Sequence, residues 1–217
     1  MGIPGIHVDL GCGAAKKEGF IGLDYVDGPQ VDHVIDLTKD RYPFEDHSVD
    51  SVFSSHFLEH IEEPHHVFSE IGRICKDGAH IEFWTPYAFT GEAFLYGHLR
   101  FMTEQQWMHF CVWHRDAFLD MLGGRWQLKR IVYVIQPARV REIRSAGLRL
   151  DFAVRHLKDV VSELGVEIEF REDPEVPAVR PELMHATSRS NARRPLGRGP
   201  RMGARRWLSK LAPGARS

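Results

Sequence analysis

Ile6-His7-Val8-Asp9-Leu10-Gly11-Cys12-Gly13 is the stretch that decides the fold, because a short apolar run here ends in two glycines separated by one residue. Apolar runs of this length followed by turn residues are typical of buried β-strands. Since glycine has no Cβ, the backbone amides of such a turn can approach a ligand closely. Lys16 stands where the dinucleotide-binding fingerprint has its third glycine. The turn therefore favours a ligand with a ribose and little or no phosphate.

Further apolar runs along the chain predict strands that end in polar or acidic residues. Between two of them, Val67, Ile71 and Ile74 recur at near-helical spacing and predict a helix. Strands that alternate with helical crossovers form parallel sheets. We therefore predict a doubly wound α/β fold with a mainly parallel sheet and an antiparallel C-terminal strand. The predicted strands span residues 6–10, 20–23, 31–35, 49–53, 80–85, 128–135 and 166–170.

Residues 87–115 interrupt this pattern, since they are rich in aromatic residues and histidine and show no sustained periodicity. We interpret them as an inserted lid on the substrate side. Within the lid, Thr103 and Gln106 form a capping box that predicts a short helix. A later amphipathic helix is predicted at residues 152–164, with Gly165 as its stop signal.

The composition favours one folded domain followed by a basic tail. With 217 residues and 43% hydrophobic content, the chain can bury a single core, which we place at residues 1–172. Residues 173–217 are rich in Pro, Gly and Arg and are predicted to be mostly disordered. No apolar run approaches the roughly 18 residues of a membrane span, and the first residues lack a secretion signal. We therefore expect a cytoplasmic protein.

Two acidic residues at predicted strand ends are candidates for binding a nucleoside. The carboxyl ends of strands in open α/β sheets form the edge at which ligands bind. At this edge the Asp24 carboxylate can accept hydrogen bonds from both hydroxyls of a ribose. Asp36 can accept one from an adenine amino group. The alternative is that both are ordinary strand-end acids.

Five segments in the first part of the chain extend this pattern: Val8-Asp9-Leu10-Gly11-Cys12-Gly13, Gly19-Phe20-Ile21-Gly22-Leu23-Asp24, Asp36-Leu37, Pro43-Phe44-Glu45-Asp46-His47-Ser48-Val49-Asp50 and Leu58-Glu59-His60. In this order they resemble the class I, Rossmann-like methyltransferases. The resemblance is strongest to the bacterial small-molecule and sugar-modifying branch, and it covers about residues 6–86. It implies that S-adenosylmethionine is the cofactor.

The resemblance also implies roles for individual residues. The glycine turn, at Gly11 and Gly13, would contact the methionine part of the cofactor. Asp24 would hold the ribose, and Asp36 with Leu37 would hold the adenine. The expected cofactor-binding set is completed by Asp9, Tyr25 and Ser54.

Two departures from the family pattern affect how the ligands are covered. The link from Gly13 to Asp24 is too short for the full helix that usually separates those elements. The first strand also begins almost at the N-terminus, which leaves no room for the usual cap helix. We therefore expect residues 87–115, or a neighbouring subunit in a homo-oligomer, to cover the substrate.

The resemblance implies methyl transfer. We expect the acceptor to be a small molecule, methylated on a hydroxyl of a sugar or natural product. The cofactor supplies the electrophile, so the protein must position the acceptor and remove its proton. Histidine suits the role of general base, because its pKa lies near neutrality. The candidates are His98, His56 and His60, although His60 also fits a structural role. The other histidines lack the companions of a metal site, so no metal is expected.

Two alternatives remain open. The chain could be a non-catalytic binding module that keeps the nucleotide fold, or an RNA or protein methyltransferase that uses the basic tail. Residues 183–217 carry a net charge of about +9, whereas residues 1–182 carry about −11. Because the acidic body would repel a phosphate backbone, nucleic acid is the less favoured partner.

Overall fold

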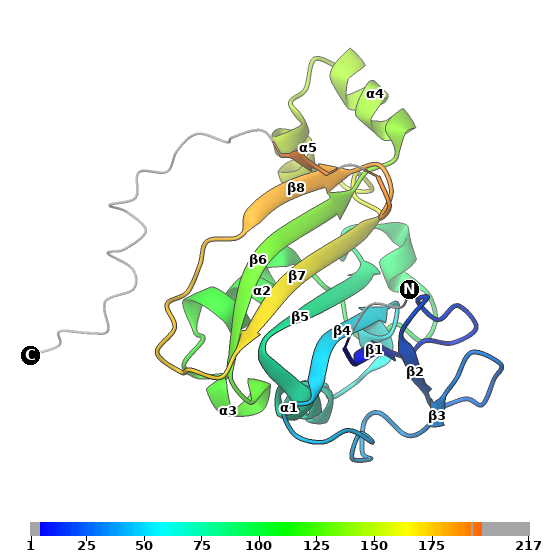
Figure 1. Ribbon diagram of the computed structural model, residues 1–217. Helices are drawn as coiled ribbons and strands as arrows, with labels where there is room; N and C mark the ends of the chain where they lie inside the picture. The colour runs from blue at the N-terminus through cyan, green and yellow to red at the C-terminus, as the bar shows by residue number, and fades with distance from the viewer. Residues whose placement is uncertain (1–4, 192, 197–217) are drawn as a thin grey trace, which may run out of the picture.

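The computed structural model describes residues 5–191 and 193–196. Within these ranges one mixed sheet has the strand order β3-β2-β1-β4-β5-β7-β6-β8-β9 (Figure 1). The strands are β1 (His7–Leu10), β2 (Ile21–Asp24), β3 (His33–Val34), β4 (Val49–Ser55), β5 (Cys75–Pro86), β6 (Arg125–Val134), β7 (Glu163–Arg171), β8 (Glu182–Ala186) and β9 (Arg194–Pro195). The helices are α1 (His65–Ile74), α2 (Glu104–Met108), α3 (Leu119–Leu122), α4 (Pro137–Ser145) and α5 (Leu150–His156), with the short helical turns η1 (Leu58–His60), η2 (Gly91–Phe94) and η3 (His109–Trp113).

The sheet is parallel in its first half and mixed in its second. β1 pairs parallel with both β2 and β4, and β4 pairs parallel with β5. β7 runs antiparallel to both β5 and β6. This arrangement confirms the predicted α/β class, with its mainly parallel sheet and antiparallel C-terminal strand. Since the chain order reverses on the two sides of β1, the carboxyl ends of β1, β2 and β4 form the edge at which such sheets bind ligands.

Aromatic side chains join the helices to one face of the sheet. Phe68 of α1 packs against Phe83 of β5 and Trp126 of β6, with ring centroids 6.3 and 5.3 Å apart. Trp107 of α2 stacks on Phe83 with centroids 5.2 Å apart. In Figure 1, α1, α2 and α3 lie behind the sheet. Each aromatic side chain of this size contributes about 2–3 kcal/mol when buried, so this layer supplies much of the stability.

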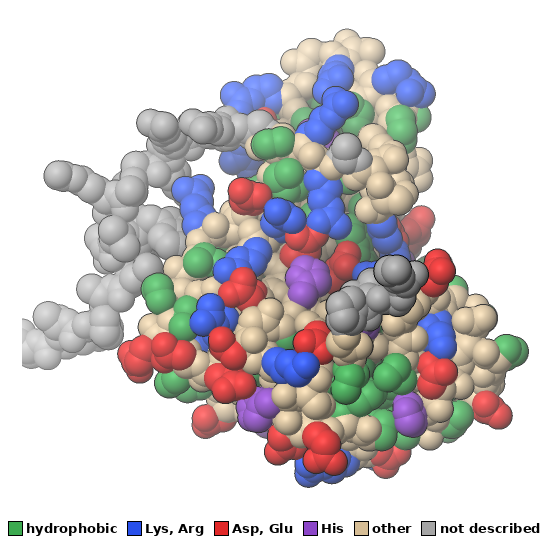
Figure 2. Space-filling model, in the orientation of Figure 1, with side chains coloured by type: hydrophobic (Ala, Val, Ile, Leu, Met, Phe, Trp, Pro, Cys, Tyr) green, Lys and Arg blue, Asp and Glu red, His purple; other side chains and the backbone are tan. Residues whose placement is uncertain are grey.

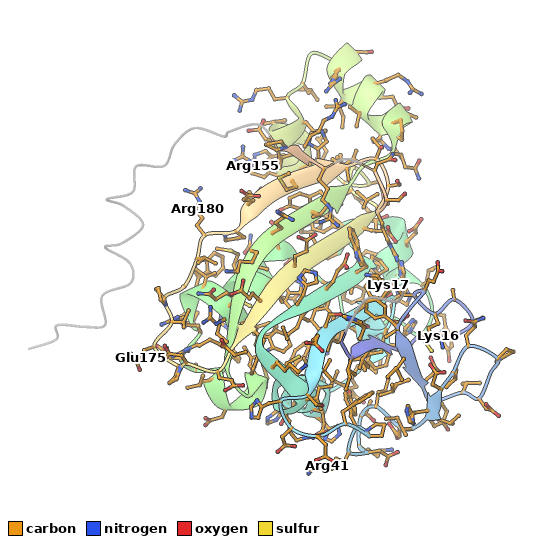
Figure 3. The ribbon with its side chains drawn as sticks, in the orientation of Figure 1. Lys16, Lys17, Arg41, Arg155, Glu175 and Arg180 are labelled. Atoms are coloured by element: carbon orange, nitrogen blue, oxygen red, sulfur yellow. The ribbon has the colours of Figure 1, made fainter. Side chains whose placement is uncertain are left out.

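The opposite face carries charged side chains where a second helix layer would lie. The connections between β1, β2, β3 and β4 are fully described and contain no helix. Lys17, in the β1–β2 connection, pairs with Glu82 of β5 at 3.0 Å and lies 3.9 Å from the centroid of the Phe53 ring. Arg193 contacts both Glu82 and Glu167. Figure 2 shows acidic and basic side chains interspersed across this face, and Figure 3 places Lys16 and Lys17 on the loop beside the sheet.

The prediction of a helix at residues 152–164 is wrong in its extent. α5 ends at His156, and β7 begins at Glu163. Gly165 is not a helix stop but lies within β7, opposite Trp84. A Cβ at Gly165 would lie 2.4 Å from the Trp84 ring, so glycine is required there by close packing.

The prediction of a mostly disordered segment after residue 172 is wrong for residues 182–186 and 194–195. Residues 182–186 form β8, which pairs parallel with β6, and residues 194–195 form β9, which pairs with β8. The free edge of β6 offers backbone donors and acceptors to a further strand. Pairing with this edge orders the segment even though its composition is polar. The domain therefore extends beyond residue 172, and residues 197–217 of the predicted tail lie outside the described residues. Over the described ranges, the helices are too short or too polar to cross a membrane.

Candidate cofactor and acceptor site

The glycine turn after β1 is tied to the end of β2. The amides of Gly11 and Cys12 donate hydrogen bonds to the Leu23 carbonyl oxygen, at 2.9 and 3.3 Å. Gly11 and Gly13 have positive φ values of 67° and 52°, which glycine adopts without strain. A Cβ at Gly11 would lie 2.6 Å from the ring of Phe57, whereas one at Gly13 would meet no atom of the described residues within 4 Å. The turn is therefore packed on one side and open on the other.

Asp24 closes this turn from the end of β2. Its two carboxylate oxygens accept hydrogen bonds from the Gly13 and Val26 amides, each at 2.9 Å. The Asp24 side chain is half-buried and Tyr25 beside it is 73% exposed. Each carboxylate oxygen has further lone pairs, so the same side chain can also accept hydrogen bonds from a ligand. The structure thus brings Gly11, Gly13 and Asp24 together, as predicted.

Asp9 and Ser54 lie inside this edge of the sheet and hold the turn in place. Asp9 is buried and accepts a hydrogen bond from the Lys17 amide at 2.7 Å. Burial raises the pKa of Asp9 from 3.8 to about 6, because desolvation penalises the charged carboxylate. Ser54 is also buried and donates to the Leu10 carbonyl oxygen at 2.9 Å. Both side chains therefore support the glycine turn through protein contacts.

Asp36 and Leu37 follow β3 and begin a tight turn of their own. The Asp36 carboxylate accepts hydrogen bonds from the Thr38 hydroxyl at 2.6 Å and from the Lys39 ammonium group at 2.9 Å. These bonds lower the pKa of Asp36 to about 2, so it is an anion at neutral pH. Leu37 is buried. A broad groove of about 600 Å³ starts directly after this turn; its lining is Thr38, Lys39, Ile61, Glu62, Glu63, His65, His66 and Ser69.

His56 is held between two carboxylates just after β4. Its Nδ1 lies 3.0 Å from Glu59 Oε1, and its Nε2 lies 2.7 Å from Glu163 Oε1. Hydrogen bonds to Glu163 and then to Glu59 raise the pKa of His56 to about 9. Because both ring nitrogens are engaged, the geometry gives His56 the role of a cation that orients Glu59.

His60 and His98 come together, although they lie on different segments. Their ring centroids are 4.8 Å apart. His60 Nδ1 lies 3.0 Å from the Gly97 carbonyl oxygen, which fixes the ring. His98 Nδ1 is buried and has no hydrogen-bond partner within the described structure. Beside them, Glu59 is 1% exposed and was not among the predicted site residues.

Two further residues of this site were missed, and both lie far along the chain. Glu163, the first residue of β7, holds His56 and accepts hydrogen bonds from Arg189. Arg189 also donates to the Ser55 hydroxyl at 2.6 Å. Arg189 lies in the segment predicted to be disordered, and no local pattern marks either residue. Their positions follow from the sheet pairing, which the sequence alone does not reveal.

The aromatic residues of the insertion divide between the core and the surface. Trp107 is 1% exposed and belongs to the core. Phe94 and Phe101 are 62% and 41% exposed, and their ring centroids lie 4.8 Å apart. The predicted capping box is present, since the Thr103 amide donates to Gln106 Oε1 at 2.9 Å.

Comparison with known proteins matches residues 15–83 to the family described as methyltransferase domain, about a third of the chain. Similar solved structures include a SAM dependent methyltransferase from Archaeoglobus fulgidus, with 16% identity and a TM-score of 0.53 over 76% of this chain and 86% of that one. A SAM-dependent methyltransferase from Thermotoga maritima, described as a possible histamine N-methyltransferase, has 14% identity and a TM-score of 0.51 over 78% and 84%. The [4+2]-cyclase SpnF has 14% identity and a TM-score of 0.51 over 80% and 78%. Curated protein sequences give no match.

The chain therefore has the Rossmann-like methyltransferase fold. Together with the domain match, this fold supports S-adenosylmethionine-dependent methyl transfer as the class of activity and S-adenosylmethionine as the cofactor. Gly11, Gly13 and Asp24 fit that cofactor, because they form an open turn beside a carboxylate able to accept from a ribose. SpnF, named as a cyclase, has a similar fold, so the reaction must be argued from the site.

Proposed function

We propose that the protein transfers the methyl group of S-adenosylmethionine to a hydroxyl of a small molecule such as a sugar or natural product. The observation that carries the proposal is the packing of Phe57 against Gly11, where an added Cβ would lie 2.6 Å from the ring. This contact places the segment that contains Glu59 and His60 directly beside the turn expected to hold the cofactor. Groups able to take up a proton and the cofactor turn therefore share one edge of the sheet.

Methyl transfer from a sulfonium is an in-line displacement for which the bound cofactor supplies the electrophile. The chain must orient the acceptor, exclude water and take up the hydroxyl proton. We assign the proton to His98, because its buried Nδ1 has no protein partner among the described residues. His56 is less suited, since both of its ring nitrogens already bond to carboxylates.

The surface of the insertion supports an acceptor with apolar or ring faces. Phe94 and Phe101 form an exposed pair, and Tyr96 between them is fully exposed. Sugars and aromatic rings pack on such faces, and the area they cover adds to the binding free energy. We propose that this surface, next to His98 in the same segment, binds the acceptor.

Incubation of the full-length protein with S-adenosylmethionine and a panel of acceptors tests the proposal. We expect S-adenosylhomocysteine to form together with an O-methylated sugar or phenol, detected by mass spectrometry. Matched deoxy compounds, which lack the hydroxyl, serve as controls and should give no product. Methylation confined to amines, RNA or proteins would contradict the proposed acceptor, and absence of any turnover across the panel would favour a binding module.

A further inference from the structure

We propose that Glu59, His60 and His98 form a binding site for a divalent transition-metal ion. One ligand atom from each of the three side chains lies within 4.8 Å of the other two. Glu59 and His60 belong to η1, whereas His98 belongs to the loop after η2. Two ligands bound to one ion at about 2.1 Å are separated by roughly 3–4 Å, so modest side-chain rotations would close the cluster.

Two buried polar atoms in this cluster have no hydrogen-bond partner among the described residues. Glu59 is 1% exposed, and its Oε1 bonds to His56 while its Oε2 has no hydrogen-bond partner within the described structure. His98 Nδ1 is also buried and has no hydrogen-bond partner among the described residues. Burying a carboxylate oxygen without a partner is unfavourable, because the hydrogen bonds it makes to water are lost and not replaced. A cation between the two atoms would satisfy both of them at once.

The remaining contacts orient the side chains as ligands. The His60 Nδ1 proton can be donated to the Gly97 carbonyl oxygen at 3.0 Å, which leaves the Nε2 lone pair available. A backbone carbonyl that fixes the tautomer in this way is typical of metal-bound histidines. His56 plays the corresponding part for Glu59, because it bonds Oε1 and leaves Oε2 free.

The loop that carries His98 is fixed to η1 by its backbone. The Glu59 carbonyl oxygen accepts hydrogen bonds from the Leu99 and Arg100 amides, at 2.7 and 3.1 Å. The Arg100 guanidinium also donates to the Ile61 carbonyl oxygen at 2.8 Å. These bonds hold His98 next to Glu59 and His60, so little further ordering would be needed when an ion binds.

The ligand set defines the class of ion. Two imidazoles with one carboxylate favour Zn²⁺, Fe²⁺, Co²⁺ or Mn²⁺ over Mg²⁺ and Ca²⁺, which prefer oxygen ligands. Three protein ligands leave at least one coordination position open, as in catalytic sites. An acceptor hydroxyl bound in that position would have a lower pKa and would release its proton to solvent water. This catalytic role of the ion rests on the proposed function, and in it His98 acts as a metal ligand in place of a base. Binding of the ion does not depend on the proposed function.

Calorimetric titration of ZnCl₂ into the full-length, tag-free protein, freed of metal with EDTA and then dialysed, tests the site. We expect one saturable equivalent, with Glu59→Gln and His98→Ala each weakening it by at least about 100-fold. His156→Ala, which removes an exposed histidine on α5, is the matched control and should change the affinity by less than about two-fold. CoCl₂ should give a visible absorption band that the Glu59 and His98 variants lose.

His60→Ala keeps the test decisive if the buried variants do not fold, because His60 is exposed and its loss should leave the circular dichroism spectrum unchanged. Absence of saturable binding, or wild-type affinity in folded His60→Ala, would overturn the metal site. Metal binding is measured without cofactor or acceptor, so it can succeed where methyl transfer fails. Conversely, O-methyl transfer that is insensitive to EDTA, by a protein that binds no metal, would remove the site and leave the proposed function standing.

Discussion

Replacing Asp24 by alanine is expected to weaken S-adenosylmethionine binding by at least about 100-fold. The wild-type carboxylate accepts hydrogen bonds from the Gly13 and Val26 amides and so holds the glycine turn against the end of β2. In the proposed complex it also accepts from the ribose hydroxyls. A hydrogen bond to a charged group contributes about 1.5–3 kcal/mol, so losing the ribose contacts and the fixed turn together gives an effect of this size. Isothermal titration calorimetry measures the affinity of the wild-type protein and of the variant for S-adenosylmethionine.

Two variants control for indirect effects of the Asp24 substitution. Asp24→Asn keeps one carbonyl oxygen as an acceptor, so we expect its affinity to lie between those of wild type and Asp24→Ala. Asp27→Ala removes an exposed acid three positions further on and should leave binding unchanged. If Asp24→Ala bound the cofactor as tightly as wild type while remaining folded, the ribose would have to bind elsewhere.

Gly72→Ala is expected to lower the free energy of unfolding by about 2–3 kcal/mol. In an exposed helix the same change would raise stability by about 1 kcal/mol, because alanine has the higher helix propensity. Gly72, however, lies where α1 meets the end of α3, and an added Cβ would lie 2.2 Å from the Leu122 carbonyl oxygen. The atoms nearest to this Cβ, in Leu122 and Gly123, belong to the backbone and cannot rotate away. The two helices must therefore separate.

Urea denaturation followed by circular dichroism checks this prediction. Ser69→Ala, on the same helix, is the matched control and should be neutral or slightly stabilising, since it changes propensity without the clash. An unfolding free energy for Gly72→Ala equal to or above that of wild type would show that α1 and α3 are not packed as closely as described. The packing of Phe68 on Phe83 would then also be in question.

The parts of the fold and site that the sequence predicted are those encoded locally. A run of apolar residues that ends in Gly11 or Asp24 signals a buried strand and its end within a few positions. Because parallel strands end at one edge, the predicted strand ends also placed Gly11, Gly13 and Asp24 together. The fold class followed from the order of these elements, not from any single one.

The parts that were missed depend on contacts between distant segments. His56 and Glu163 are separated by 107 positions, and Arg189 reaches Ser55 across 134. Glu59 was overlooked as a site residue because its partner His98 lies on another segment and only the loop contacts bring them together. Gly165 was misinterpreted because glycine serves both as a helix stop and as a point of close packing, and only the position of Trp84 distinguishes the two.

Calorimetric titration of S-adenosylmethionine into the intact wild-type protein tests the central claim, that the turn between β1 and β2 holds this cofactor. We predict one saturable site per chain that is blocked by S-adenosylhomocysteine, which shares the adenosine and amino-acid parts. ATP should not block it, because the turn lacks the third glycine of the dinucleotide fingerprint and any phosphate-binding loop. No saturable binding, or displacement by ATP as effective as by S-adenosylhomocysteine, would contradict the claim.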